Sequence, residues 1–129
     1  MSHASTVSLK IDNLECLKRA CTQLNLKFME NQHSYIMYFG PKPCEHAIKV
    51  PGAQYEVGLT KTEDGKFQLV ADFYSSGGLP KTIGNNASKI VQYYTAERVK
   101  LELRKKSGKV SFRGQKMIGE TLQMELIEY

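Results

Sequence analysis

The chain begins with alternating polar and apolar residues and then changes to a helical spacing. Apolar residues at every second position from 7 to 11 predict a strand over residues 6–11 with one apolar face. Apolar residues then recur every three or four positions, which predicts a helix over residues 14–24. Asp12 or Asn13 can accept hydrogen bonds from the free amides of its first turn. This spacing places Cys21 on the buried stripe of the helix and Cys16 off it.

Short apolar runs follow, separated by polar or proline-rich segments. Residues 26–29 and 34–39 read as two strands joined by the polar turn 30–33, which predicts a hairpin. The Gly-Pro-Lys-Pro segment at 40–43 is expected to end the second strand, and residues 46–50 to add one more short strand.

The clearest local signal is an Asp-Gly pair between two alternating runs. Residues 55–61 alternate toward Asp64 and Gly65, and residues 67–73 alternate away from them. Asp-Gly at this place is typical of a tight hairpin turn. We therefore expect a hairpin here.

The second half of the chain contains a glycine-rich segment, a long helix and a final hairpin. The composition of residues 75–87 predicts a loop, and nothing interrupts a helix over residues 88–106, which Gly108 is expected to end. Two further alternating strands are separated by a turn at Gly119. The order of elements predicts an α+β fold, with a mainly antiparallel sheet and two helices packed on one face.

The long helix has two apolar stripes. One comprises Thr95, Ala96, Val99 and Leu103, and the opposite one Ile90, Tyr94 and Leu101. The first half of the chain can cover the second stripe, or a second subunit can cover it. Ile127 and Tyr129, on the other face of the last strand, add to the argument for a homo-oligomer. The residues expected in one core are Val7, Leu9, Leu17, Tyr55, Val57, Leu59, Phe67, Leu69, Phe73, Val99, Leu103, Phe112, Leu122, Met124 and Leu126.

Composition fits an ordinary globular chain. Its 129 residues are 41% hydrophobic and 24% charged, which predicts one domain over residues 1–129 and excludes disordered and collagen-like classes. No apolar run is long enough for a membrane span, and no signal segment opens the chain. Three cysteines cannot all pair with one another. We expect a soluble protein with reduced thiols in the cytoplasm or an equivalent reducing compartment, such as the plastid stroma or a host cytoplasm.

The net charge of +5 favours anionic partners, and the basic residues are concentrated near the end of the chain. A candidate nucleic-acid stripe over residues 98–116 comprises Arg98, Lys100, Arg104, Lys105, Lys109 and Arg113. A solvated helix face explains the same charges and is the favoured interpretation.

Catalytic and metal signatures are weak. His33, Cys44 and His46 are natural metal ligands, but their spacing matches no closed site. No hydrolase, zinc-protease or phosphate-loop motif occurs. We therefore predict that the protein is not an enzyme and holds no metal and no cofactor.

A better candidate lies where the glycine-rich segment leads into the long helix. Free amides and the positive end of a helix dipole favour an anion there, such as a nucleotide. The candidate ligand-binding residues are Gly77, Gly78, Lys81, Asn85, Asn86, Ser88 and Lys89. Alternatively, the glycines and asparagines only build turns and Ser88 only caps the helix.

Several segments are similar to one family. They are the start Met1-Ser2-His3, the first helix, the hairpin at 56–59, 63–65 and 70–73, and the helix segment 94–103. Together they resemble the hypothetical chloroplast reading frame thirty-five family, or domain of unknown function 1257. Residues 44–54 and 75–86 depart from it. The resemblance implies the order of elements and an intracellular setting, and it carries over no catalytic residue or cofactor.

These observations predict a small intracellular binding protein that recognises an anionic ligand. The alternatives are a protein adaptor that works through an exposed apolar face, and a nucleic-acid-binding protein that uses the basic stripe.

Overall fold

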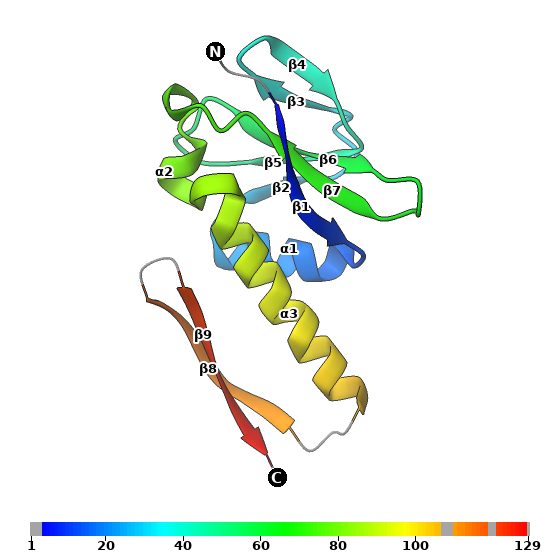
Figure 1. The fold of residues 1–129 in the computed structure, drawn as a ribbon, viewed down its shortest axis with the longest axis vertical. Helices are drawn as coiled ribbons and strands as arrows, with labels where there is room; N and C mark the ends of the chain where they lie inside the picture. Colours follow the sequence, from blue (N-terminus) through cyan, green and yellow to red (C-terminus); the bar gives the residue numbers. More distant parts are fainter. Residues whose placement is uncertain (1–3, 107–109, 119–120, 129) are drawn as a thin grey trace.

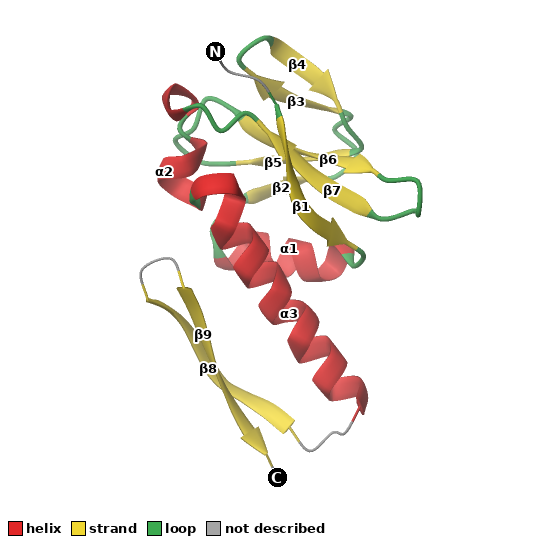
Figure 2. Cartoon of the chain, in the orientation of Figure 1, coloured by secondary structure: helices red, strands yellow, loops and turns green. Residues whose placement is uncertain are grey.

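A five-stranded antiparallel sheet lies between two helices on one face and a two-stranded hairpin on the other (Figure 1). The computed structural model describes residues 4–106, 110–118 and 121–128, and from residue 106 onward it describes the backbone alone. The elements in chain order are β1 (Ser5–Ile11), α1 (Leu14–Gln23), β2 (Lys27–Met29), β3 (Ser34–Met37), β4 (Gly40–Pro43), β5 (His46–Lys49), β6 (Glu56–Lys61), β7 (Phe67–Ala71), η1 (Ser75–Gly77), α2 (Leu79–Ile83), η2 (Asn85–Ala87), α3 (Ser88–Lys106), β8 (Val110–Ile118) and β9 (Thr121–Glu128). The predicted α+β class, with α1 and α3 on one face of the sheet, is confirmed (Figure 2).

The strands of the main sheet lie in the order β1-β7-β6-β5-β2, and every neighbouring pair is antiparallel. The β6–β7 hairpin predicted from Asp64 and Gly65 is confirmed. Gly65 has a φ of +81°, and its N–H donates to the carbonyl of Thr62 at 3.0 Å. Lys10 of β1 also pairs with Asp64 at 2.8 Å, so the adjacent strand holds the same turn.

The first helix begins as predicted and is covered on more than one side. The side chain of Asn13 accepts the N–H of Cys16 at 3.0 Å, so Asn13 is the capping residue. Cys21 is buried as expected, but the prediction that Cys16 lies off the buried surface is wrong. The long helix α3 packs against α1, and this contact covers a second side of the shorter helix.

Of the two expected accounts of the second stripe of α3, the one in which the chain itself covers it is confirmed, and the first stripe is buried only in part, with Ala96 inside. Ile90 and Tyr94 are buried, and Leu101 packs against the same core, so the first half of the chain covers this stripe. Val99 is 38% exposed, so its assignment to the core is wrong. Thr95 is exposed as well. The argument for a homo-oligomer therefore loses the helix residues on which it depended.

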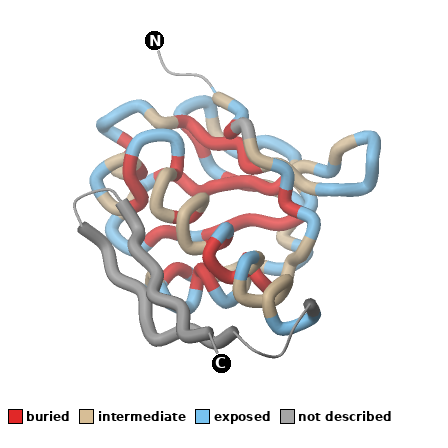
Figure 3. Tube along the Cα trace, turned by 60° about the horizontal axis from the view of Figure 1, so that its bottom comes forward, coloured by how far each residue is buried: buried red, intermediate tan, exposed pale blue. Residues whose placement is uncertain are grey.

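Most other core predictions agree with the structure, and buried positions run along the central strands (Figure 3). The buried members of the expected set are Val7, Leu17, Tyr55, Val57, Leu59 and Leu69. The partly buried members are Leu9, Phe67, Phe73 and Leu103. The side chains of Phe112, Leu122, Met124, Leu126 and Ile127, and the whole of Tyr129, lie outside the described part.

The hairpin predicted over residues 26–39 is wrong. β2 pairs with β5, while β3 pairs with β4, the proline-rich segment expected to end the strand. Proline accepts an extended backbone and is tolerated on edge strands, so this segment can pair once. Between β2 and β3, Asn31 and His33 have positive φ angles of 58° and 67°. The N–H of Asn31 donates to His46 Nδ1 at 2.9 Å, which ties this connection to β5.

Residues 75–87 were expected to form a loop, and that expectation is also wrong, because they contain η1, α2 and η2. Pro80 lies in the first turn of α2, where the missing N–H has no cost. Gly78 and Gly84, with φ angles of +87° and +82°, lie at the two ends of this helix. The glycines therefore bound a short helix instead of preventing one.

The final hairpin is confirmed in its backbone. β8 and β9 pair antiparallel, with an irregularity between Phe112 and Gly114. The turn predicted at Gly119 lies outside the described residues. Of the helices in the described part of the chain, none is long and apolar enough to cross a membrane.

Candidate functional site

The predicted anion-binding segment is folded back against the rest of the chain. A Cβ atom on Gly77 would lie 1.9 Å from the ring of Tyr55, and one on Gly78 would lie 3.2 Å from Ala53 Cα. Both N–H groups donate to nearby backbone carbonyl oxygens, at 3.0 and 3.1 Å. These two glycines therefore permit close packing, and their amides are not available to an anion.

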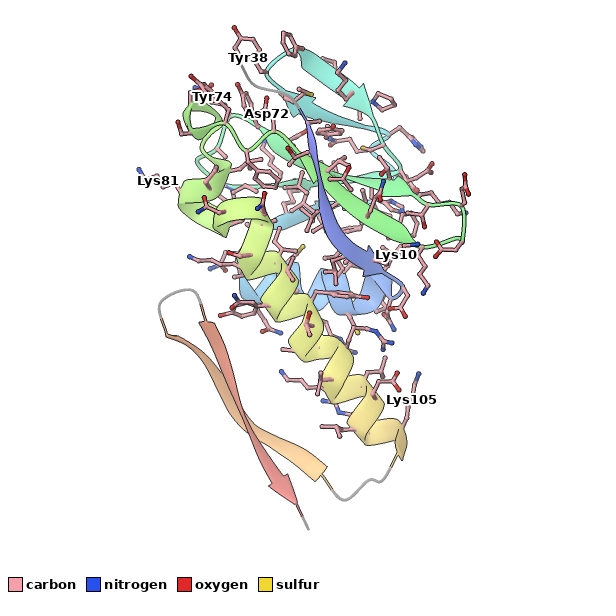
Figure 4. The ribbon with its side chains drawn as sticks, viewed as in Figure 1. Lys10, Tyr38, Asp72, Tyr74, Lys81 and Lys105 are labelled. Carbon is pink, nitrogen blue, oxygen red and sulfur yellow. The ribbon has the colours of Figure 1, made fainter. Side chains whose placement is uncertain are left out.

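The other predicted ligand residues are spread over α2, η2 and the start of α3. Lys81 extends from α2 toward solvent (Figure 4), Asn85 and Asn86 are exposed, and Lys89 is half-buried. Lysine and asparagine side chains thus surround this segment, but its glycine amides do not form a binding site for an anion.

Ser88 does not cap the long helix. It is the first residue of α3 and already has helical angles, with φ −56° and ψ −35°. Its Oγ is buried and has no hydrogen-bond partner among the described residues. A Cβ atom on Gly84 would lie 2.2 Å from this oxygen, so the hydroxyl is covered by the neighbouring backbone.

The predicted basic stripe is partly neutralised by acidic side chains. Arg98 pairs with Asp12 at 2.9 Å and with Glu102 at 3.2 Å. Lys100 pairs with Glu97 at 3.0 Å, and that carboxylate is buried. Ion-paired cations are less available to phosphates.

Two further members of the stripe lie at the exposed end of α3. Arg104 and Lys105 are exposed near the end of α3, far along the helix from the sheet (Figure 4). Lys109 and the side chain of Arg113 lie outside the described part of the chain.

The candidate metal ligands serve other purposes. His46 is buried between the rings of Phe28 and Phe67, at centroid distances of 5.6 and 5.3 Å. Its Nδ1 accepts a backbone hydrogen bond, whereas His33 is exposed. Among the side chains that the structure describes, no group of three or more His, Cys, Asp or Glu residues could hold a metal ion.

The thiol at Cys44 is not activated for nucleophilic attack. Burial raises its pKa, a backbone hydrogen bond at Leu59 lowers it, and the Glu56 and Glu45 carboxylates raise it further. The net direction is upward, whereas a catalytic thiol needs a depressed pKa. The same holds for Cys21 in α1, where burial raises the pKa to about 12.

A surface that the sequence analysis did not single out lies on the outer face of the β3–β4 hairpin. Its large side chains are Ile36 at 46% exposure, Tyr38 at 60% and Phe39 at 61%. Pro41 and Pro43 of β4 are exposed beside them. We call these five residues the hairpin patch. The rings of Tyr38 and Phe39 meet edge to face, with centroids 4.9 Å apart.

The inner face of the same hairpin packs on a row of small residues in the main sheet. Tyr35 and Met37 are buried with Ala47 and Val70 in a second apolar cluster. Gly58 of β6 lies between Ala47 of β5 and Val70 of β7 in the register of the sheet. A Cβ atom at Gly58 would lie 2.4 Å from the Tyr35 ring, so glycine is needed for this approach.

Two buried carboxylates hold one edge of the hairpin. Glu56 of β6 accepts the N–H of Ile36 at 3.1 Å. Asp72, which follows β7 and is 1% exposed, accepts the N–H of Tyr38 at 3.3 Å and that of Tyr74 at 3.0 Å. Hydrogen bonds to charged acceptors are stronger than neutral ones. The amide of Ile36 in β3 and that of Tyr38 just after it are therefore bound to side chains of β6 and of the segment after β7.

The opposite edge of the hairpin has no free donors at two of its positions. The N–H of Cys44 donates to the carbonyl of His33 at 3.1 Å. Hydrogen-bonded positions alternate along an antiparallel pair. Pro41 and Pro43 therefore occupy the positions of β4 whose backbone nitrogen points away from β3, toward the open edge. Proline has no N–H, so another strand cannot pair normally here. Addition of a further strand at this edge is therefore disfavoured.

A sequence signal for this surface exists. Tyr35 and Met37 alternate with Ile36 and Tyr38, so a strand here has two apolar faces, one of which must remain uncovered unless another element packs on it. The alternation does not say which face is outward, because the small row beneath Tyr35 comes from distant strands.

Comparison with known proteins adds no relative. No family model matches the chain, and neither a curated protein nor a solved structure is significantly similar to it. The resemblance to the chloroplast reading frame thirty-five family stays a prediction, and the residues of this chain carry the functional argument.

Proposed function

We propose that this protein is a non-enzymatic binding protein that docks a partner protein through the hairpin patch. The observation that supports this proposal most strongly is the exposure of three large apolar side chains on one small hairpin. Exposed apolar surface that is concentrated in one place, as opposed to scattered, is typical of interaction sites. Aromatic residues are also enriched among the residues that dominate binding energy.

The raised pKa values of the three thiols argue against a cysteine nucleophile. Burial raises the pKa of Cys16, Cys21 and Cys44, so each thiol is less reactive than a free cysteine. All three are unpaired, which favours the cytoplasm or an equivalent reducing compartment as the place of action.

The alternatives have weaker support. Recognition of an anionic ligand would use Lys81, Lys89 and the start of α3, but the amides of Gly77 and Gly78 are already bonded. Nucleic-acid binding would depend on the exposed end of α3, since Arg98 is engaged by two carboxylates.

A matched pair of surface variants tests the docking proposal. The double variant Ile36→Lys and Phe39→Lys places charge on the hairpin patch, while Val99→Lys changes an exposed apolar residue on α3. Tagged full-length chains are purified from cells, and the retained proteins are quantified by mass spectrometry. We expect a specific partner to be retained by the wild type and by Val99→Lys and lost from the double variant, with all three chains equally folded by circular dichroism.

Two results would contradict the proposal. One is equal retention of the same partners by all three chains. The other is a rise in melting temperature with a nucleotide, alongside no partner that depends on the patch. Light scattering at several concentrations identifies a second copy of the chain as the partner, because the wild-type mass would then fall to that of a 14.6 kDa monomer in the double variant.

A further inference from the structure

We propose that the hairpin patch recognises a basic segment of its partner, with an arginine or lysine side chain seated against Tyr38 and Tyr74. This inference rests on the proposed docking function and names the chemistry of the partner. Two observations support it: buried carboxylates are bound to the backbone of the patch, and the residues of the patch are uncharged.

A buried carboxylate is bound to the backbone of both exposed tyrosines. Asp72 accepts the backbone N–H groups of both Tyr38 and Tyr74, so the two residues are attached to one buried carboxylate. Glu56 is attached in the same way to Ile36. Among the described residues, neither carboxylate has a lysine, arginine or histidine at ion-pair distance. Both carboxylates are thus held by amides. Lys49 of β5 lies opposite Glu56 in the register without forming an ion pair, and Asp72 has no ion pair with any described residue.

The outer face of the hairpin supplies no cation of its own. Lys42 is the charged residue of β4, and it lies opposite Tyr35 in the register. Directly paired residues project from the same face of a hairpin. Lys42 therefore shares the face of Tyr35 and not that of Ile36. Lys42 is exposed, but the register places it on the opposite face from Ile36, so the residues of the hairpin patch are themselves uncharged.

Two exposed tyrosine rings suit a cation. Tyr38 and Tyr74 come from the β3–β4 turn and from the chain after β7, and both lie at the same end of the molecule (Figure 4). Tyr74 is 49% exposed. The face of an aromatic ring attracts ammonium and guanidinium groups, and a nearby carboxylate adds to this attraction. Arginine also stacks flat on such rings, which suits this site better than a point charge.

Other occupants fit less well. A phosphate would meet the field of Asp72 and Glu56, which repels it. A strand would need donors at Pro41 and Pro43. Because the protein carries a net charge of +5, general electrostatic attraction does not draw a basic peptide to it, so binding would have to come from the local site.

The test uses two labelled ten-residue peptides and the full-length protein. In one peptide arginine alternates with alanine, and in the other each arginine is replaced by citrulline, which has nearly the same shape and no charge. Fluorescence polarisation measures both dissociation constants. We expect the arginine peptide to bind at least about tenfold more tightly than the citrulline peptide. We also expect its affinity to fall as salt is raised.

Protein variants locate the binding. Tyr74→Leu and Tyr38→Leu keep the apolar character of the surface and remove the ring, and each should weaken the arginine peptide about two- to fivefold. Asp72→Asn should weaken it as well. The matched control Asp64→Asn, which removes an exposed carboxylate at the β6–β7 turn, should have no effect. Because Asp72→Asn can loosen the hairpin, its melting temperature is measured, and the two leucine variants decide the outcome if it is unfolded.

The possible outcomes separate this inference from the docking proposal. Equal affinity for both peptides, with binding lost in the Ile36→Lys and Phe39→Lys variant, would overturn cation recognition and keep docking. Failure of the arginine peptide to bind at all would overturn cation recognition. Retention of cellular partners by the double variant would overturn docking itself, whatever the peptides do.

Discussion

The two faces of the central sheet are covered in different ways. On the helix face, large aliphatic side chains such as Leu59 and Leu69 pack against α1 and α3. On the hairpin face, the row Ala47, Gly58 and Val70 has little volume, and the hairpin is fastened through hydrogen bonds to buried carboxylates. The helices are thus held to the sheet mainly by buried apolar area. The hairpin is held by a smaller apolar contact and by hydrogen bonds to the carboxylates of Glu56 and Asp72.

This difference separates stability from recognition. Burial of large aliphatic groups is the main source of folding free energy, so the helix face should dominate the stability of the chain. The hairpin contributes less, and its outer surface is left free for a partner. Substitutions on the two faces should therefore have different sizes of effect and different readouts.

The largest effect should come from the helix face. Leu69→Ala removes a fully buried side chain and should lower the free energy of unfolding by about 2 to 5 kcal/mol in urea denaturation. Its neighbour Val70 points to the hairpin face, and Val70→Ala should cost less. A loss of under about half a kcal/mol for Leu69→Ala, a size typical of surface sites, would mean that the two faces are assigned the wrong way round.

The next effect tests the small row on the other face. Gly58→Ala would place a methyl group against the Tyr35 ring and should destabilise the protein by about 1 to 3 kcal/mol through overpacking. Repeating the substitution in a Tyr35→Ala background, where the ring is absent, should remove most of this cost. If the cost is the same in both backgrounds, the hairpin does not pack on Gly58.

A smaller effect should come from the polar contact between α3 and the start of α1. The hydroxyl of Tyr94 donates to Asp12 at 2.8 Å and accepts the Asp12 N–H at 3.0 Å. Tyr94→Phe should therefore cost about 1 kcal/mol at neutral pH, and Tyr93→Phe serves as a control of the same size.

The effect of Tyr94→Phe should also depend on pH. The hydrogen bond from Tyr94, together with the charge of Arg98, lowers the pKa of Asp12 below 3.8 in the folded state. The stabilisation is complete above the unfolded pKa and is lost as the pH falls through the lower folded one. The difference in the free energy of unfolding between wild type and Tyr94→Phe should therefore become smaller below about pH 4. A difference that stays constant down to pH 2 would show that the hydroxyl acts only through the Asp12 backbone.

The smallest effect concerns rates and not stability. At pH 8 iodoacetamide should alkylate Cys44 first, because it is partly exposed beside the hairpin, and react far more slowly with Cys16 and Cys21 under α3. Mass spectrometry of timed samples follows each site. Alkylation of all three at one rate would mean that the protein opens as a unit under these conditions.

The sequence predicted the elements whose signals are local. Asp64 and Gly65 determine a turn between adjacent strands, so the β6–β7 hairpin was predictable. A cap at Asp12 or Asn13 was predictable too, and the structure uses Asn13. The pairing of β2 with β5 joins Lys27 to Lys49, and no local pattern encodes a contact across that distance.

The same reason explains the errors in the candidate site. The two apolar stripes of α3 were visible, but the position of α1 decides that Tyr94 is inside and Val99 outside. Gly77 was read as a ligand-binding residue because nothing in the sequence places Tyr55 against it. The anchoring carboxylates were missed because Asp72 meets Tyr38 only after the hairpin folds over the sheet.

The blocked edges of the β3–β4 hairpin also bear on how the protein behaves when it is concentrated. An exposed apolar strand is normally a hazard, since it can template the growth of fibrils. Here Pro41 and Pro43 remove outward donors from one edge, and carboxylates occupy the amides of Ile36 and Tyr38 on the other. The outer face of the hairpin can therefore stay apolar and exposed at high protein concentration, because its edges do not offer the free donors that growth of cross-β structure requires.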